Sequence, residues 1–66
     1  MNVTINGRSE LLEQGVTVAL LLQQLKLEPI RVAVEVNEDL VTRREFERTT
    51  LREGDRVEIV TFVGGG

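Results

Sequence analysis

The chain has 66 residues, a length that allows one small domain with a marginal core. Leu, Val, Ile and Phe supply 24 of the 66 residues, well above the level of roughly one-fifth below which a charged chain is expected to be disordered. Cys, His, Trp and Tyr are absent, which excludes disulfides, Cys/His zinc sites, triads built on Cys or His, and aromatic platforms for nucleic acid.

The net charge is −3, from 8 basic and 11 acidic residues, so a basic surface for nucleic acid is not expected. The longest apolar run, Val18 to Leu22, is far shorter than the roughly 20 residues that span a bilayer. The first residues carry neither a basic region nor an apolar signal segment. We therefore expect a soluble, cytoplasmic domain with no membrane or nucleic-acid partner.

The N-terminal segment predicts a hairpin. Two apolar residues alternate with Asn and Thr over residues 2–6, as in a half-buried strand. Asn6-Gly7 follows and favours a type I′ turn, because both central residues of that turn need a positive φ. Residues 8–13 would form the return strand, and two adjacent leucines near its end leave its register open.

A helix is predicted next. Thr17 is a candidate N-cap, and apolar residues follow at helical spacing: Val18, Leu21, Leu22 and Leu25. Leu20 stands where a capping box would place Glu or Gln, and it should face away from the core. Lys26 suits a helix C-terminus, and Pro29 is expected to end the helix after about ten residues.

The C-terminal half predicts two further strands and a short helical turn. Residues 31–37 alternate, with valines on one face, and a turn and a short strand at residues 40–41 follow. Thr42 and Glu45 match a capping box for a helical turn that carries Phe46 inward. Residues 56–62 should form the last strand.

Because a helix this short cannot bury its apolar face alone, it must lie on the sheet. The order of elements predicts an α+β fold of β-grasp type, with a mixed sheet of four to five strands on one helix. We expect one domain over residues 1–63 and a flexible tail over residues 64–66. The predicted core consists of Val3, Ile5, Val18, Leu21, Leu22, Leu25, Val32, Val34, Leu51, Val57 and Ile59, with Phe46 at its edge.

Side chains offer little chemistry. The pairs Glu10/Glu13 and Glu35/Glu38 could be imagined as acid and base, Glu38/Asp39 as metal ligands, and Arg43-Arg44 as an anion site. Solvated surfaces and ordinary turn chemistry explain each of these groups as well. No metal or cofactor site is predicted.

The sequence Gly64-Gly65-Gly66 directly follows the last predicted strand. One interpretation is a frayed end. The other is that the carboxylate of Gly66 reacts, since glycines let the end enter a narrow active site of another protein in any backbone conformation. Attack of that carboxylate on the α-phosphate of ATP would give an acyl adenylate, which a sulfur or amine nucleophile could then take over.

Segments 1–7, 31–37 and 51–60, together with the glycine end, resemble the ThiS family of ubiquitin-like sulfur carriers in thiamine biosynthesis over essentially the whole chain. A departure is Leu20, where the family often has an acidic residue. The resemblance implies that Gly65 and Gly66 are the family's diglycine, with Val63 and Gly64 completing the segment held by partners.

The resemblance also implies the chemistry and the partners. An E1-like adenylyltransferase of ThiF type would adenylate Gly66 with ATP, and a sulfur donor system would convert it to a thiocarboxylate. A thiazole synthase of ThiG type would receive the sulfur. The chain would be a protein co-substrate that binds no cofactor, and not an enzyme.

The last strand suggests a docking patch. Val57 and Ile59 should face inward, so Val60 and Phe62 should face outward, beside the exposed side of Ala33. The alternative is that Phe62 only packs on a neighbouring strand.

Other functions remain open on the residues alone. They are a related carrier for molybdopterin, tRNA thiolation or cysteine synthesis, a protein modifier or interaction module, and an enzyme that uses surface carboxylates.

Overall fold

The protein is built around a five-stranded sheet in which the last strand of the sequence lies at the centre. In the computed structural model, which describes residues 1–62, the strand order is β2-β1-β5-β3-β4. The strands are β1 (Asn2–Ile5), β2 (Arg8–Leu11), β3 (Val32–Val36), β4 (Asp39–Val41) and β5 (Arg56–Thr61). β1 runs parallel to β5, and the other neighbours are antiparallel. This is the predicted mixed sheet on one helix.

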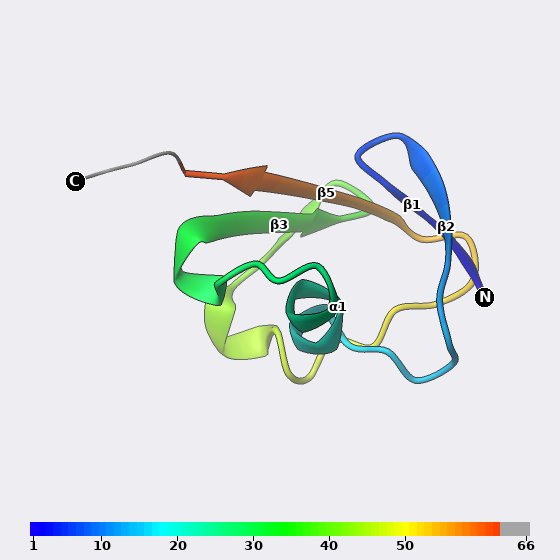
Figure 1. Cartoon of the computed structure of the whole chain (residues 1–66), viewed down its shortest axis with the longest axis horizontal. Helices are drawn as coiled ribbons and strands as arrows, with labels where there is room; N and C mark the ends of the chain where they lie inside the picture. Colours follow the sequence, from blue (N-terminus) through cyan, green and yellow to red (C-terminus); the bar gives the residue numbers. More distant parts are fainter. Residues whose placement is uncertain (63–66) are drawn as a thin grey trace.

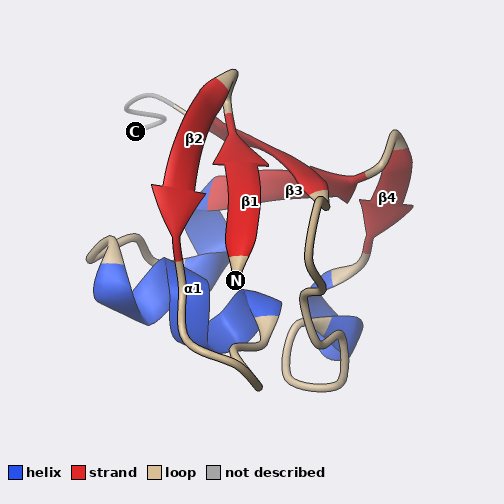
Figure 2. Cartoon of the chain, turned by 90° about the vertical axis from the view of Figure 1, so that its right-hand side faces the viewer, coloured by secondary structure: helices blue, strands red, loops and turns tan. Residues whose placement is uncertain are grey.

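The remaining elements lie on one side of this sheet. They are the helix α1 (Val18–Gln24) and two 3₁₀ turns, η1 (Pro29–Arg31) and η2 (Arg43–Glu45). Figures 1 and 2 show α1 packed under the strands, with the two short turns beside it. The sheet therefore has an inner face, toward α1, and an outer face. Among residues 1–62, the structure contains no helix that is long and apolar enough to cross a bilayer.

Both hairpins close through turns with positive φ at their two central residues, as type I′ turns require. In the β1–β2 hairpin, φ is 50° at Asn6 and 82° at Gly7, as the sequence predicts. In the β3–β4 hairpin, φ is 53° at Asn37 and 72° at Glu38. Glu38 thus holds a backbone conformation that strongly favours glycine.

The two turn asparagines also attach both hairpins to β5. The Asn6 carboxamide accepts a hydrogen bond from the Ile59 N–H at 2.8 Å and donates one to the Ile59 carbonyl at 3.1 Å. It extends the β1–β5 pairing beyond the backbone of β1. The Asn37 side chain accepts from the Arg56 N–H at 3.0 Å and donates to Asp55 Oδ1 at 3.0 Å.

The helix begins as predicted and ends earlier. Thr17 Oγ1 accepts a hydrogen bond from the Leu20 N–H at 3.1 Å, which confirms the N-cap. At the other end, Lys26 adopts a φ of 60°, and its N–H bonds the Gln23 carbonyl while the Leu27 N–H bonds the Leu22 carbonyl. This is a Schellman motif, and it ends the seven-residue helix before Pro29 can act.

This early end makes the prediction of a buried Leu25 wrong, since its side chain is 44% exposed. The chain reverses at Lys26, and Leu27 packs against the core instead. Leu20 faces away from the core, as predicted.

The core otherwise follows the predicted pattern. Its buried apolar residues are Val3, Val16, Val18, Leu21, Leu22, Val32, Val34, Val41, Phe46, Leu51, Val57 and Ile59. Ile5 is only half-buried against this cluster. Val16 and Val41 were not predicted. The Leu51 N–H bonds the Val16 carbonyl from a distant part of the sequence, and Val41 pairs with Val34 in the β3–β4 hairpin, so backbone pairing holds both residues in the core.

The predicted pairing of Thr42 with Glu45 is confirmed. Glu45 Oε1 accepts hydrogen bonds from the Thr42 N–H at 3.3 Å and from the Thr42 hydroxyl at 2.9 Å. The turn that begins there carries Phe46 into the core, also as predicted.

Candidate functional site

The two sides of β5 differ sharply in exposure. Val57 and Ile59 face α1 and are 1% and 7% exposed, whereas Val60 and Phe62 are 60% and 56% exposed. The predicted outward orientation of Val60 and Phe62 is therefore confirmed. These side chains lie on the last residues of the chain that the structure describes.

The pairing of β5 with β3 holds these outward residues in place. Val60 lies directly opposite Ala33, so their side chains share the outer face. The Phe62 N–H donates to the Arg31 carbonyl at 2.8 Å, which extends the pairing beyond the end of β5. Ala33 is half-buried. The structure therefore brings together the three predicted patch residues that it describes.

An open groove adjoins Phe62 and Ala33, and its lining is mostly apolar, with Thr42 and Arg43 as the polar members. Ile30 from η1 and Leu40 from β4 line it together with these two residues, and both are largely exposed. Neither Ile30 nor Leu40 was predicted as a site residue. The signal for Leu40 was its alternation with the buried Val41. We define the outer patch as Ala33, Leu40, Val60 and Phe62; Ile30 of η1 lines the groove beside it.

An acidic pair borders the outer patch. Glu35 lies directly opposite Glu58, one step along the same face from the Ala33–Val60 pair, and both side chains are exposed. Like charges directly opposite each other on a sheet are destabilising. Within residues 1–62, the ion pair that the structure contains joins Arg31 Nε to Glu28 Oε1 at 3.6 Å, so neither Glu35 nor Glu58 takes part in an ion pair.

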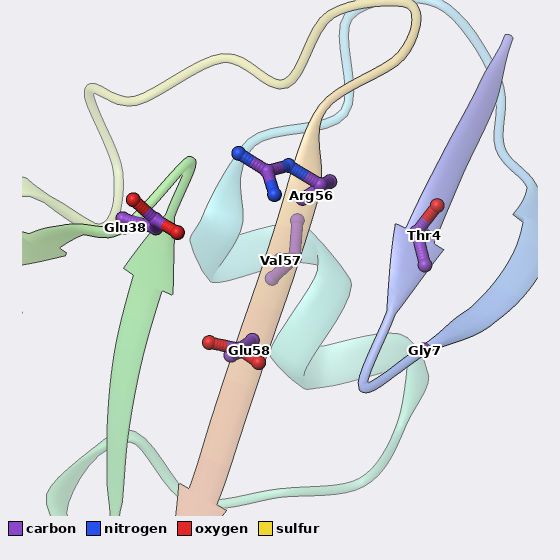
Figure 3. A pocket seen from close by; sticks show the side chains of 6 residues that line it. All are labelled: Thr4, Gly7, Glu38, Arg56, Val57 and Glu58. Atoms are coloured by element: carbon purple, nitrogen blue, oxygen red, sulfur yellow. The ribbon is translucent and has the colours of Figure 1, made fainter.

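A second depression lies on the outer face toward the hairpin turns, lined by Thr4, Gly7, Glu38, Arg56, Val57 and Glu58. Figure 3 shows Arg56 with the acidic side chains of Glu38 and Glu58 nearby. The depression holds charges of both signs, and all three of these side chains are exposed. It therefore shows no preference for a cationic or an anionic ligand.

The carboxylates considered as acid and base, Glu10, Glu13, Glu35 and Glu38, are all exposed, as are Asp39, Arg43 and Arg44. No group of three or more His, Cys, Asp or Glu residues in the described part of the chain is placed to hold a metal ion. The described residues include no buried polar or charged side chain. Side-chain catalysis therefore has no visible centre within residues 1–62.

The other predicted site residues, Val63, Gly64, Gly65 and Gly66, lie outside the described residues. The structure presents the patch that precedes them.

The sequence and the structure match the same family of known proteins. The family model described as the ThiS family matches residues 2–66. The crystal structure of the thiamine biosynthesis protein ThiS from Geobacter metallireducens matches with a TM-score of 0.85 and 38% identity, covering all of both chains. A solution structure of a thiamine biosynthesis protein from that organism has a TM-score of 0.82, again with 38% identity, and is covered to 88%. These matches confirm the predicted β-grasp fold.

Longer proteins also contain a similar segment. The whole chain is 39% identical to part of a thiazole synthase from Magnetococcus marinus and 36% identical to part of one from Paramagnetospirillum magneticum. The chain spans 20% of the length of each. It is also 35% identical to the uncharacterized protein ycf40 of Porphyra purpurea, 93% of which it covers.

Proposed function

Since the chain belongs to the ThiS family of ubiquitin-like β-grasp sulfur carriers, we propose that it carries sulfur for thiamine biosynthesis as a thiocarboxylate on Gly66. The observation that carries this proposal is the family match, which continues through the glycine end to residue 66. Gly65 and Gly66 would enter the partner's active site, and Val63 and Gly64 would complete the bound segment. Residues 1–63 would act as one domain that presents this tail over residues 64–66.

The proposed reaction uses the backbone of the chain. The Gly66 carboxylate attacks the α-phosphate of ATP, pyrophosphate leaves, and an acyl adenylate forms. Hydrosulfide (HS⁻) from the donor system then attacks the acyl carbon, AMP leaves, and loss of the proton on sulfur leaves a thiocarboxylate. The ATP site and the acid–base groups would belong to an E1-like adenylyltransferase of ThiF type, and a donor system would supply the sulfur. The carrier itself would bind no cofactor and act as a co-substrate. The carrier would act in the cytoplasm.

The proposed acceptor of the sulfur is a thiazole synthase of ThiG type. Support comes from the two thiazole synthases that contain a segment similar to the entire chain. A carrier and an acceptor that work together gain effective concentration when they are joined. The proposed docking residues are Ala33, Val60 and Phe62, because they are apolar and share the outer face, and because Val60 and Phe62 lie just before Val63 and the glycines.

The test is an intact-mass measurement. The protein is incubated with ATP, a sulfur donor and the adenylyltransferase of the same organism. We expect one terminal oxygen to be replaced by sulfur. The matched control is a variant lacking Gly65 and Gly66, which should fold normally and show no conversion.

Two outcomes would contradict the proposal. An unchanged mass in the presence of an adenylyltransferase that is active on another carrier would exclude thiocarboxylate formation. A conjugate joined through lysine would instead identify a protein modifier.

A further inference from the structure

The outer face of the sheet has two adjoining parts of different character. The outer patch is apolar and lies at the end of β5 that precedes the glycines. Glu35 and Glu58 occupy the next row of the same face, two residues along each strand from Ala33 and Val60. A partner that covers the patch must therefore also meet two adjacent carboxylates.

The acidic pair is unfavourable for the isolated chain. In an antiparallel sheet, directly opposite side chains have their Cβ atoms about 4.5–5.5 Å apart, close enough for two carboxylates to repel each other. Leu40 flanks Glu35 on its other side, where it pairs across β3 and β4, and Arg56 lies two residues from Glu58 on the same face without forming an ion pair with it. A cation from outside would remove the repulsion and form charge-assisted hydrogen bonds, and a guanidinium can reach two carboxylate oxygens at once.

We propose that the outer patch and the Glu35–Glu58 pair form one docking surface for thiazole synthase. The occupant is a surface with an apolar side chain in the groove beside Phe62 and, next to it, an arginine or lysine that lies between the two carboxylates. This inference rests on the proposed function and adds the chemistry of the partner. Two observations support this occupant. An arginine or lysine would complement the two carboxylates, and two thiazole synthases contain a segment similar to this chain.

The first test compares two double variants with the same change in charge. E35Q/E58Q removes the acidic pair, and E13Q/E47Q removes two exposed carboxylates elsewhere. Binding of thiazole synthase from the same organism is measured by calorimetry at low and at physiological salt. We expect E35Q/E58Q to lose about tenfold in affinity and much of its salt dependence, with E13Q/E47Q staying within about twofold of wild type.

The second test uses two exposed leucines on the outer face. Leu40 lies in the outer patch, whereas Leu11 lies on β2 at the opposite edge of the sheet. Leu40→Gln should weaken binding of thiazole synthase severalfold, and Leu11→Gln should leave it unchanged.

Several results would overturn the inference. They are wild-type affinity in E35Q/E58Q, equal losses in both double variants, or no binding of the wild type. Loss of stability in E35Q/E58Q would show a structural role, since removal of the repulsion should leave stability equal or higher. A homodimer in sedimentation analysis that E35Q/E58Q dissolves would assign the face to a second copy. Thiocarboxylate formation by the wild type is scored separately, so the proposed function can stand when this inference fails.

Discussion

The two faces of the central strand β5 have different roles: one packs in the core, and the other is exposed. Val57 and Ile59 pack against α1 with the rest of the core, while Val60 and Phe62 are exposed beside Ala33. Neighbouring residues of one strand thus serve different purposes, because successive side chains point to opposite faces. A change on the inner face should act on folding, and a change on the outer face should act on binding. Substitutions can test this division, and they are expected to differ in their effect on the free energy of unfolding.

The largest effect is expected at Leu22, which is completely buried on α1. Leu22→Ala should lower the free energy of unfolding by about 3 kcal/mol, because it leaves a cavity in a small core. Leu20 on the exposed side of the same helix is the matched control, and Leu20→Ala should change the free energy by less than about 0.5 kcal/mol. Urea denaturation measures both. Equal losses would contradict the assignment of inner and outer sides.

The next effect concerns the attachment of the β1–β2 hairpin to β5. Asn6→Gly keeps the positive φ but removes both hydrogen bonds to Ile59, at a cost of about 2 kcal/mol. Asn37→Gly is the comparison, and its loss should be about half as large because its side-chain bonds are exposed. The ratio of the two losses in free energy of unfolding, from thermal or urea denaturation, tests whether partial burial strengthens the hydrogen bonds between Asn6 and Ile59. A smaller loss for Asn6→Gly would refute it.

A gain in stability is expected at Glu38, whose φ of 72° is strained for a residue with a side chain. Glu38→Gly should raise the free energy of unfolding by about 1 kcal/mol. Asp39→Gly, one residue on in β4, should lower it, since glycine weakens a strand. The two variants have opposite signs in this prediction, so a common sign in denaturation experiments is evidence against it.

The smallest effect on stability is expected at Phe62. Phe62→Asp should change the free energy of unfolding by less than about 0.5 kcal/mol, because the ring is more than half exposed. Binding of both proposed partners should nevertheless weaken at least about tenfold, as for an apolar anchor residue. Parallel titrations and denaturation curves give the two numbers. An unchanged affinity would remove Phe62 from the docking surface.

Local patterns predicted much of the fold. The Thr17 cap, the turn at Asn6-Gly7 and the pairing of Thr42 with Glu45 depend on residues close in sequence, and all three are confirmed. The early end of α1 was missed because a lysine, and not a glycine, takes the left-handed position.

Features that depend on distant contacts were not predicted. The bonds between Asn6 and Ile59 join residues 53 positions apart, and the burial of Val16 follows from a bond to Leu51. The same holds at the site. The outward side of β5 follows from alternation, whereas the groove is lined jointly by η1, β4 and Phe62, which lie far apart in the sequence.

The central position of β5 has a mechanical consequence. A pull applied at the C-terminal end of β5 acts along the strand, which is held by parallel pairing to β1 on one side and by antiparallel pairing to β3 on the other. Figure 1 shows β5 running lengthwise beside β3. The backbone hydrogen bonds to β3 and β1 are therefore loaded together, in shear. The Asn6 carboxamide adds a further connection between the β1–β2 turn and β5. Tension on this end is spread across the middle of the sheet and cannot peel the strand away one bond at a time.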